Sequence, residues 1–110
     1  MYARMLQFTA KPDQGSNLTQ TMRERTLPLL KQQPGFIDAL GLNSDTEPNQ
    51  FVGITIWKSK EDAEKFVTGP GQQLLQSIRA MVLGEPIVRT FNVQVSATHD
   101  VSIGRTASSS

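Results

Sequence analysis

Residues 51–58 constrain the fold of this chain most, because they read as a strand whose side chains are apolar in both phases. Phe51 and Trp57 fall in one phase. The other phase holds three aliphatic residues, Val52, Ile54 and Ile56. Two apolar faces are typical of a strand that is buried on both sides. Since one layer of helices covers only one face, the sequence predicts that something else covers the second.

The flanking patterns predict a strand, a helix, two strands, a pair of helices and a final strand. The first helix begins at Ser16 or Asn17 and stops at Gln33-Pro34-Gly35, and the later pair ends at Gly84. The expected strands are residues 2–10, 36–43, 51–58 and 87–97. This order is typical of an α+β domain in which a ferredoxin-like antiparallel sheet carries helices on one face.

Local signals set the expected limits of the helices. Pro28 removes a backbone donor, so we expect it to kink the first helix or to end its regular part. Ser59 and Asp62 fit a helix-capping pattern directly after the third strand. Gly69-Pro70-Gly71 separates the two later helices, either as a simple break or as a hinge at the mouth of a pocket.

Length and composition favour one small domain that associates with a copy of itself. The 110 residues suit a single domain, which we place at 2–97, followed by a tail at 98–110. The end of the tail, 104–110, is small and polar and is expected to be flexible. The hydrophobic share of 37% is low for a well-cored monomer, so a homodimer is the expected state.

Several classes of function are disfavoured by charge, cysteine content and hydropathy. The net charge is +1, and the 11 basic and 10 acidic residues are well mixed, so we expect no nucleic-acid partner. The chain has no cysteine, which excludes thiolate metal sites and cysteine nucleophiles. It offers no apolar stretch long enough to span a bilayer and no signal-peptide layout, so we expect no membrane partner and a cytoplasmic location.

With these elements placed, residues 2–97 resemble the antibiotic biosynthesis monooxygenase family of dimeric α+β barrels. The resemblance is carried by the element order and by Pro34-Gly35-Phe36, which opens the second strand. It is also carried by the stretch 56–63, which is similar to the family pattern W-x-S-x-E-D-A. The resemblance implies a dimer whose sheets pack face to face, which would explain the doubly apolar third strand.

The resemblance implies a function as well as a fold. Some family members oxygenate polyketide-like phenols without metal or flavin, and others bind and degrade haem. The haem-degrading members use a histidine on the helix after the strand-end tryptophan, and no histidine lies between Ser59 and Gly84 here. We therefore expect a monooxygenase without cofactor or metal that acts on a small aromatic or quinol-type substrate. The alternatives are a non-catalytic small-molecule-binding dimer and a haem protein.

Trp57 is the first candidate for the substrate site. It matches the family tryptophan that lines the pocket, and a large flat ring at a strand-to-helix junction can stack on an aromatic substrate. It could equally be a core residue that seals the sheet against the helices.

Arg4 and Arg89 lie in the apolar phases of the first and last strands, which should be neighbours, so together they could hold an anionic or phenolate oxygen. The alternative is a salt bridge, to Asp38 or to a partner subunit. Other candidates, which could orient a substrate hydroxyl or be ordinary polar strand positions, are Gln7, Thr55 and Asn92. His99, the one histidine, could act as a base, but its polar surroundings favour a solvated residue or a subunit contact.

Overall fold

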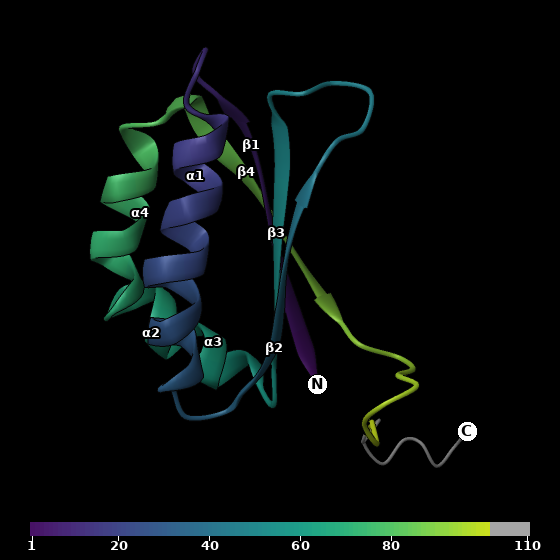
Figure 1. Ribbon diagram of the computed structural model, residues 1–110. Coiled ribbons are helices and arrows are strands. Elements are labelled where there is room, and N and C mark those ends of the chain that lie inside the picture. The colour runs from purple at the N-terminus through teal and green to yellow at the C-terminus, as the bar shows by residue number, and fades with distance from the viewer. Residues whose placement is uncertain (102–110) are drawn as a thin grey trace.

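A single antiparallel sheet of four strands organises the chain in the computed structural model, which describes residues 1–101 (Figure 1). The strands pair in the order β2-β3-β1-β4. Their bounds are β1 Tyr2–Ala10, β2 Phe36–Asn43, β3 Gln50–Trp57 and β4 Val82–Asn92. All three pairings are antiparallel. This topology confirms the predicted α+β, ferredoxin-like fold.

Among the described residues, the helices all lie on one face of this sheet and the other face carries none (Figure 1). The first connection contains three consecutive helical segments: α1 Gly15–Thr21, a π-helical segment η1 Met22–Thr26, and α2 Leu27–Lys31. The second connection contains α3 Lys60–Thr68 and α4 Gly71–Arg79, separated at Gly69 and Pro70 as predicted. No helix within residues 1–101 is long and apolar enough to cross a membrane.

Pro28 reshapes the first helix instead of ending it. A proline ring collides with the carbonyl four residues earlier and cannot donate a hydrogen bond to it. The chain meets this requirement with the wider turn of η1, in which the Leu27 amide donates to the Met22 carbonyl, five residues back. Pro28 then lies in the first turn of α2, where its missing donor costs little. The helix therefore continues to Lys31 across a π-turn.

The junction between β3 and α3 forms as its capping pattern predicts. The Ser59 hydroxyl accepts a hydrogen bond from the Asp62 amide at 3.1 Å and donates to the Asp62 carboxylate at 3.1 Å. Gly35, directly before β2, has a φ of +79°, and a Cβ there would collide with the Asp62 side chain. A glycine is therefore required at this position. The Pro34-Gly35-Phe36 junction thus packs directly against the capping motif of Ser59 and Asp62.

The last helix ends earlier than the sequence predicted, and the last strand both begins and ends earlier. Gly84 does not stop a helix: α4 ends at Arg79, and Gly84 lies within β4 with a φ of +69°. The pairing of β1 with β4 shifts between Gln7 and Thr9, so Gly84-Glu85-Pro86 forms a bulge opposite Phe8. The strand ends at Asn92 rather than at residue 97. The predicted flexible end at 104–110 lies outside the described residues.

The core between sheet and helices consists of two separate clusters. One is centred on Phe8, Leu18 and Phe51 at one end of the sheet. The other is centred on Leu30, Trp57 and Ala63 at the opposite end. Strand register places two rows of the sheet between the clusters, Arg4 beside Thr55 and Leu6 beside Gly53. Because these middle rows carry a cation, a hydroxyl and a glycine, they do not fill the space beneath the helices.

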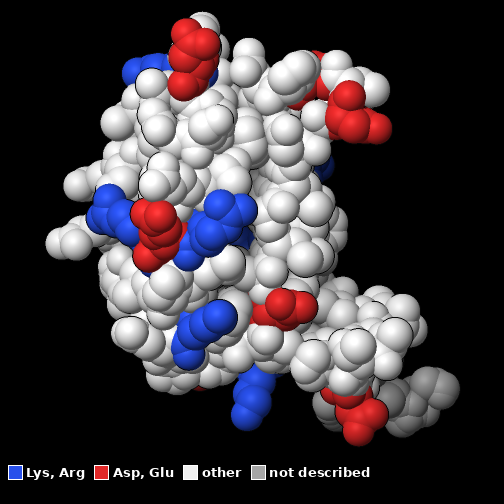
Figure 2. Space-filling view, in the orientation of Figure 1, with Lys and Arg blue, Asp and Glu red and all other residues white. Residues whose placement is uncertain are grey.

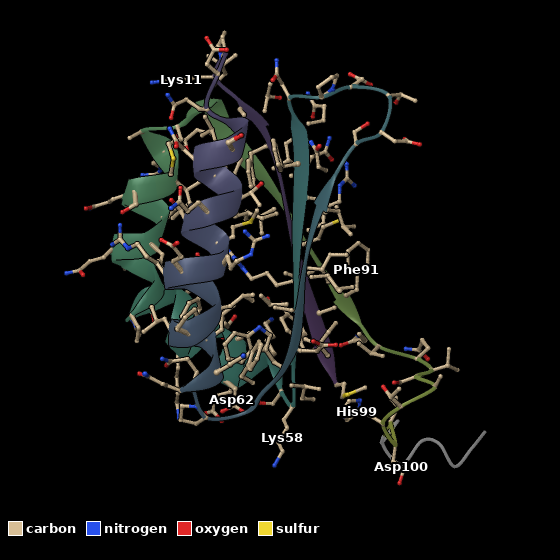
Figure 3. All side chains as sticks on the ribbon, viewed as in Figure 1. Lys11, Lys58, Asp62, Phe91, His99 and Asp100 are labelled. Carbon is tan, nitrogen blue, oxygen red and sulfur yellow. The ribbon has the colours of Figure 1, made fainter. Side chains whose placement is uncertain are left out.

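The opposite sheet surface, which we call the helix-free face, is largely apolar. It includes the second phase of β3, as predicted, together with residues of the outer strands β2 and β4. Leu40 is 56% exposed, Ile87 50% and Phe91 49%. Figure 3 shows Phe91 pointing away from the helices.

In the view of Figure 2, acidic and basic side chains are interspersed rather than gathered into one large block.

Candidate ligand-binding site

A cavity of about 120 Å³ lies between the sheet and the helices, in the gap between the two core clusters. We call it the inner cavity. Its walls come from β1, β3, the first helical connection, α3 and α4. The lining residues that matter below are Arg4, Met22, Thr26, Gly53, Thr55 and Trp57. The lining is mostly apolar with a few polar groups, as is typical of small-molecule sites.

Trp57 forms one wall of the inner cavity and is also a core residue. It is 1% exposed, and its ring packs edge-on against Phe36 at a centroid distance of 5.6 Å. Phe66 of α3 lies on it at 5.5 Å. Its indole nitrogen donates a hydrogen bond to the Thr55 hydroxyl at 2.9 Å. The ring is therefore held in one orientation by packing and by a hydrogen bond, while it remains in contact with the cavity.

Arg4 brings a positive charge to the inner cavity. Burial lowers the pKa of its guanidinium, and the neighbouring Tyr2 hydroxyl partly offsets this effect. Within residues 1–101, Arg4 has no carboxylate within 4.0 Å. Glu64, which shares a neighbouring groove with Arg4, lies 4.0 Å from Lys60 instead. A partly desolvated cation of this kind favours an anionic ligand.

The other predicted site residues fall at different places. Thr55 lines the inner cavity and orients Trp57. Asn92 pairs with Tyr2 at the exposed end of β4 and does not line the cavity. Gln7 and Arg89 lie in the opposite strand phase from Arg4, because Arg4 pairs with Thr90 while Arg89 pairs with Met5. The two arginines are thus on neighbouring strands, as expected, but on opposite faces of the sheet.

The proposed salt-bridge and base residues lie away from the cavity as well. Asp38 is exposed, and its carboxylate accepts a hydrogen bond from the adjacent Ala39 amide. Neither Arg4 nor Arg89 forms an ion pair with it in the part of the chain described. His99 is exposed in the segment after β4, and its ring hydrogen-bonds the Thr98 hydroxyl at 2.9 Å (Figure 3).

Three of the cavity residues named above were not predicted as site residues from the sequence: Met22, Thr26 and Gly53. The Thr26 hydroxyl is buried and has no hydrogen-bond partner among the described residues. A Cβ built at Gly53 would meet no atom within 4 Å. A glycine inside a central strand is a signal that could have been followed, because it often marks a close approach by a ligand.

The inner cavity does not suit haem. Its volume of about 120 Å³ is far below that of a porphyrin site, and α3 contributes only Phe66 and Val67 to its lining. Haem iron takes a single axial side chain such as histidine or cysteine, and none of the described residues that line the cavity is either of these. The cavity is closer in size to a single aromatic ring.

Two larger hollows border the β2–β3 loop. One, of about 590 Å³, lies between that loop and α1, and the other, of about 740 Å³, lies beside Gln7 and Val52. Most residues that line them are exposed, and neither hollow touches Trp57 or Arg4. Their size reflects open surface, so the inner cavity remains the better candidate for a binding site.

Comparisons with known proteins agree with this architecture. The family model described as antibiotic biosynthesis monooxygenase matches residues 1–77. A comparison with curated protein sequences gave no match. Among solved structures, SnoaB, a cofactor-independent oxygenase from Streptomyces nogalater, is similar with a TM-score of 0.70 and 19% identity, over 89% of this chain and 97% of that one.

Two further structures show the same fold. A monooxygenase from the gene ActVA-Orf6 of Streptomyces coelicolor, in complex with nanaomycin D, gives a TM-score of 0.75 at 15% identity, over 90% of this chain and 92% of that one. A protein of unknown function from Nitrosomonas europaea gives 0.77 at 16% identity, over 90% and 94%. At these identities the likeness establishes the fold and leaves the reaction open.

Proposed function

The chain belongs to the antibiotic biosynthesis monooxygenase family, and from this premise we propose that it is a cofactor-independent monooxygenase of a small aromatic or quinol-type substrate. The observation that carries the proposal is the placement of Arg4, Thr55 and Trp57 around one cavity. Trp57 stacks on the substrate ring, and Arg4 faces its ionised oxygen. Thr55 keeps the indole ring in place.

In such a reaction the substrate itself supplies the electrons. An anthrone-type CH₂ group and O₂ give a carbonyl group and water, so one oxygen atom enters the product and the other leaves as water. The reactive species is the substrate anion, which transfers electrons to O₂ far more readily than the neutral form. Arg4 stabilises that anion, and the apolar walls exclude water from the reduced oxygen species.

The identity of the base follows from the same lining. Among the residues 1–101 that line the inner cavity, Arg4 is the one titratable residue. The substrate proton therefore passes to solvent as the substrate enters, before the apolar walls exclude water, and the protein promotes its loss by lowering the pKa of the substrate through the Arg4 charge. This mechanism limits the substrates to phenols, anthrones and quinols that are already weakly acidic.

Oxygen consumption tests this function directly. We expect uptake when the protein is mixed with an anthrone-like or quinol substrate, and a loss of at least about tenfold in kcat/KM for Arg4→Gln. Arg89→Gln is the matched control, because it removes the same charge from the opposite sheet face. If no substrate of a broad panel consumes oxygen while one still binds tightly, the alternative of a non-catalytic binding protein is correct.

We also propose that the protein is a homodimer that pairs through the helix-free face. That surface places apolar side chains such as Leu40, Ile87 and Phe91 in contact with solvent in the single chain. An apolar face of this kind is typical of a protein interface. Sedimentation at micromolar concentration should give about twice the chain mass of 12.1 kDa, and a monomer would refute the pairing. A cytoplasmic location stays a prediction from the sequence.

A further inference from the structure

A second cavity adjoins the inner one and shares part of its wall. This outer cavity, of about 200 Å³, lies between the first helical connection and the strands β2 and β3. Four residues line both cavities: Met22, Thr26, Gly53 and Thr55. Exposed Arg23 also lines the outer cavity, so that this cavity reaches the surface. The two spaces are therefore neighbours divided by a small set of side chains.

On the sheet side, two glycines lie where the two cavities adjoin. Gly41 of β2 and Gly53 of β3 are register partners, and both line the outer cavity. Neither has a positive φ, so the backbone conformation does not require glycine at either position. A β-branched residue would be the more stable choice in the interior of a strand. What these glycines provide is space on the sheet surface, and we call the pair the glycine window.

On the helix side, the Met22 side chain covers the glycine window. A Cβ built at Gly41 would lie 3.4 Å from the Met22 sulfur and 3.4 Å from its terminal methyl carbon. Methionine is unbranched and flexible, so its side chain can move with little cost when a ligand requires the space. It is carried by η1, the π-helical turn that Pro28 imposes.

Thr26 supplies a polar group at the same point. In a regular α-helix a threonine hydroxyl can bond the carbonyl four residues back, which here belongs to Met22. The π-turn directs that carbonyl to the Leu27 amide instead. The Thr26 hydroxyl is left buried, without a partner among the described residues, where the two cavities meet. A buried hydroxyl in this state favours a ligand that offers a hydrogen-bonding group.

We propose that the two cavities are one binding site, and that the ligand crosses the glycine window beneath Met22. The site then takes an elongated flat anion with more than one ring, whose acidic end faces Arg4 and whose middle carries a hydroxyl or carbonyl group for Thr26. Met22 and Gly53 set its length. This inference rests on the inner cavity of the proposed function. The outer cavity brings the available space into the range of ordinary ligand sites, about 300 Å³ and above.

Substitution of Gly53 tests the window without harming the fold. The Cβ of Gly53→Ala meets no atom within 4 Å, and Gly53→Leu extends from there into the empty space. Both variants should unfold at the wild-type temperature or above it. Val52→Leu is the control, because its side chain lies on the same strand but in the opposite phase.

Binding can be read from the fluorescence of Trp57, the one tryptophan of the chain. The probes are salicylate, with one ring, and 1-hydroxy-2-naphthoate, with two. Because Gly53 lines both cavities, we expect Gly53→Leu to weaken both probes, the two-ring probe at least about tenfold and the one-ring probe by a clearly smaller factor. Gly53→Ala should give the same ranking with a smaller effect, and Val52→Leu should change neither. Thr26→Val should weaken the two-ring probe about fivefold.

The outcomes separate this inference from the proposed reaction. If Gly53→Leu leaves the two-ring probe unchanged, or weakens both probes equally, the window is not part of the site. If the window result holds but no oxygen is consumed, the site is as proposed and the monooxygenase activity is wrong. If neither probe quenches Trp57 in the wild-type protein, both proposals fail.

Discussion

The two faces of the sheet are built from the same four strands but differ in what lies against them. On the helix-covered face, two packed clusters leave a hollow in which a cation, two hydroxyls and a glycine meet. On the helix-free face, aliphatic and aromatic side chains meet solvent in the single chain. The helix-covered face has a packed core with a cavity at its centre. The helix-free face has apolar side chains that none of the described residues covers in the single chain. This difference suggests that ligand binding and association belong to opposite sides of one sheet.

The largest effect is expected at the wall shared by the core and the cavity. Trp57→Ala should lower the free energy of unfolding by about 3–5 kcal/mol, because it removes a ring that is 1% exposed and packed between Phe36 and Phe66. Denaturant titration measures this loss. A loss below about 1 kcal/mol would mean that Trp57 faces the ligand without supporting the core.

The helix-free face can be tested with two adjacent residues of β4. Ile87 is 50% exposed and Val88 48% exposed, but they point to opposite sides of the sheet. Ile87→Glu should raise the Kd for dimerisation at least about 30-fold, because it places an uncompensated charge in the interface. Val88→Glu should leave the Kd within about threefold. Equal effects in analytical ultracentrifugation would contradict the assignment of association to one face.

The charge of Arg4 should appear in the pH dependence of the reaction. Because a nearby cation stabilises the substrate anion, the wild-type rate should rise at a lower pH than the reaction of the free substrate. Arg4→Gln should move the midpoint of the rate profile upward by about one pH unit, and Arg89→Gln should not. An unchanged midpoint in Arg4→Gln would show that another group controls ionisation of the substrate.

Arg4 should also carry a cost in the protein without ligand. Burial lowers its pKa, which means that the folded state disfavours the charged guanidinium. The unfolded state holds that charge more easily over the whole range below the lowered pKa, so folding is opposed at neutral pH. Arg4→Met should therefore raise the melting temperature of the ligand-free protein while it weakens anion binding. A lower melting temperature would point to a stabilising contact of Arg4.

The smallest effect is expected at Thr55, which holds the Trp57 ring in place. Thr55→Val removes the acceptor of the indole hydrogen bond and should cost about 1–2 kcal/mol of stability, since the indole nitrogen is then left without a partner. The same change should weaken aromatic ligands only a few-fold. Thermal unfolding and the fluorescence of Trp57 measure the two effects separately.

The sequence predicted the features that local chemistry controls. Ser59 and Asp62 cap α3 as expected, and the strand that carries Trp57 has two apolar phases. Gly84 was misassigned because a glycine followed by a proline two residues later ends a helix and also suits a β-bulge. The distinction depends on pairing with β1, which the local sequence does not contain.

The site was harder to predict than the fold because it depends on register. Arg4 and Arg89 both lie in apolar strand segments, yet the observed register pairs Arg4 with Thr90 and sends the two arginines to opposite faces. The partnership of Gly41 and Gly53 depends on the same kind of alignment between β2 and β3. The buried Thr26 hydroxyl lacks a partner among the described residues because of the π-turn, and Pro28 signals a disturbance of the helix without specifying its form.

The central claim is that the ligand binds on the helix-covered face, beside Arg4 and Trp57. Titration of Trp57 fluorescence with an anionic aromatic ligand tests it most directly, in the wild-type protein and in the Arg4→Gln and Arg89→Gln variants. Saturable quenching in the wild-type protein, a Kd at least about tenfold higher in Arg4→Gln and an unchanged Kd in Arg89→Gln are the predicted results. A Kd that rises in Arg89→Gln and not in Arg4→Gln would place the ligand on the other face and contradict the account.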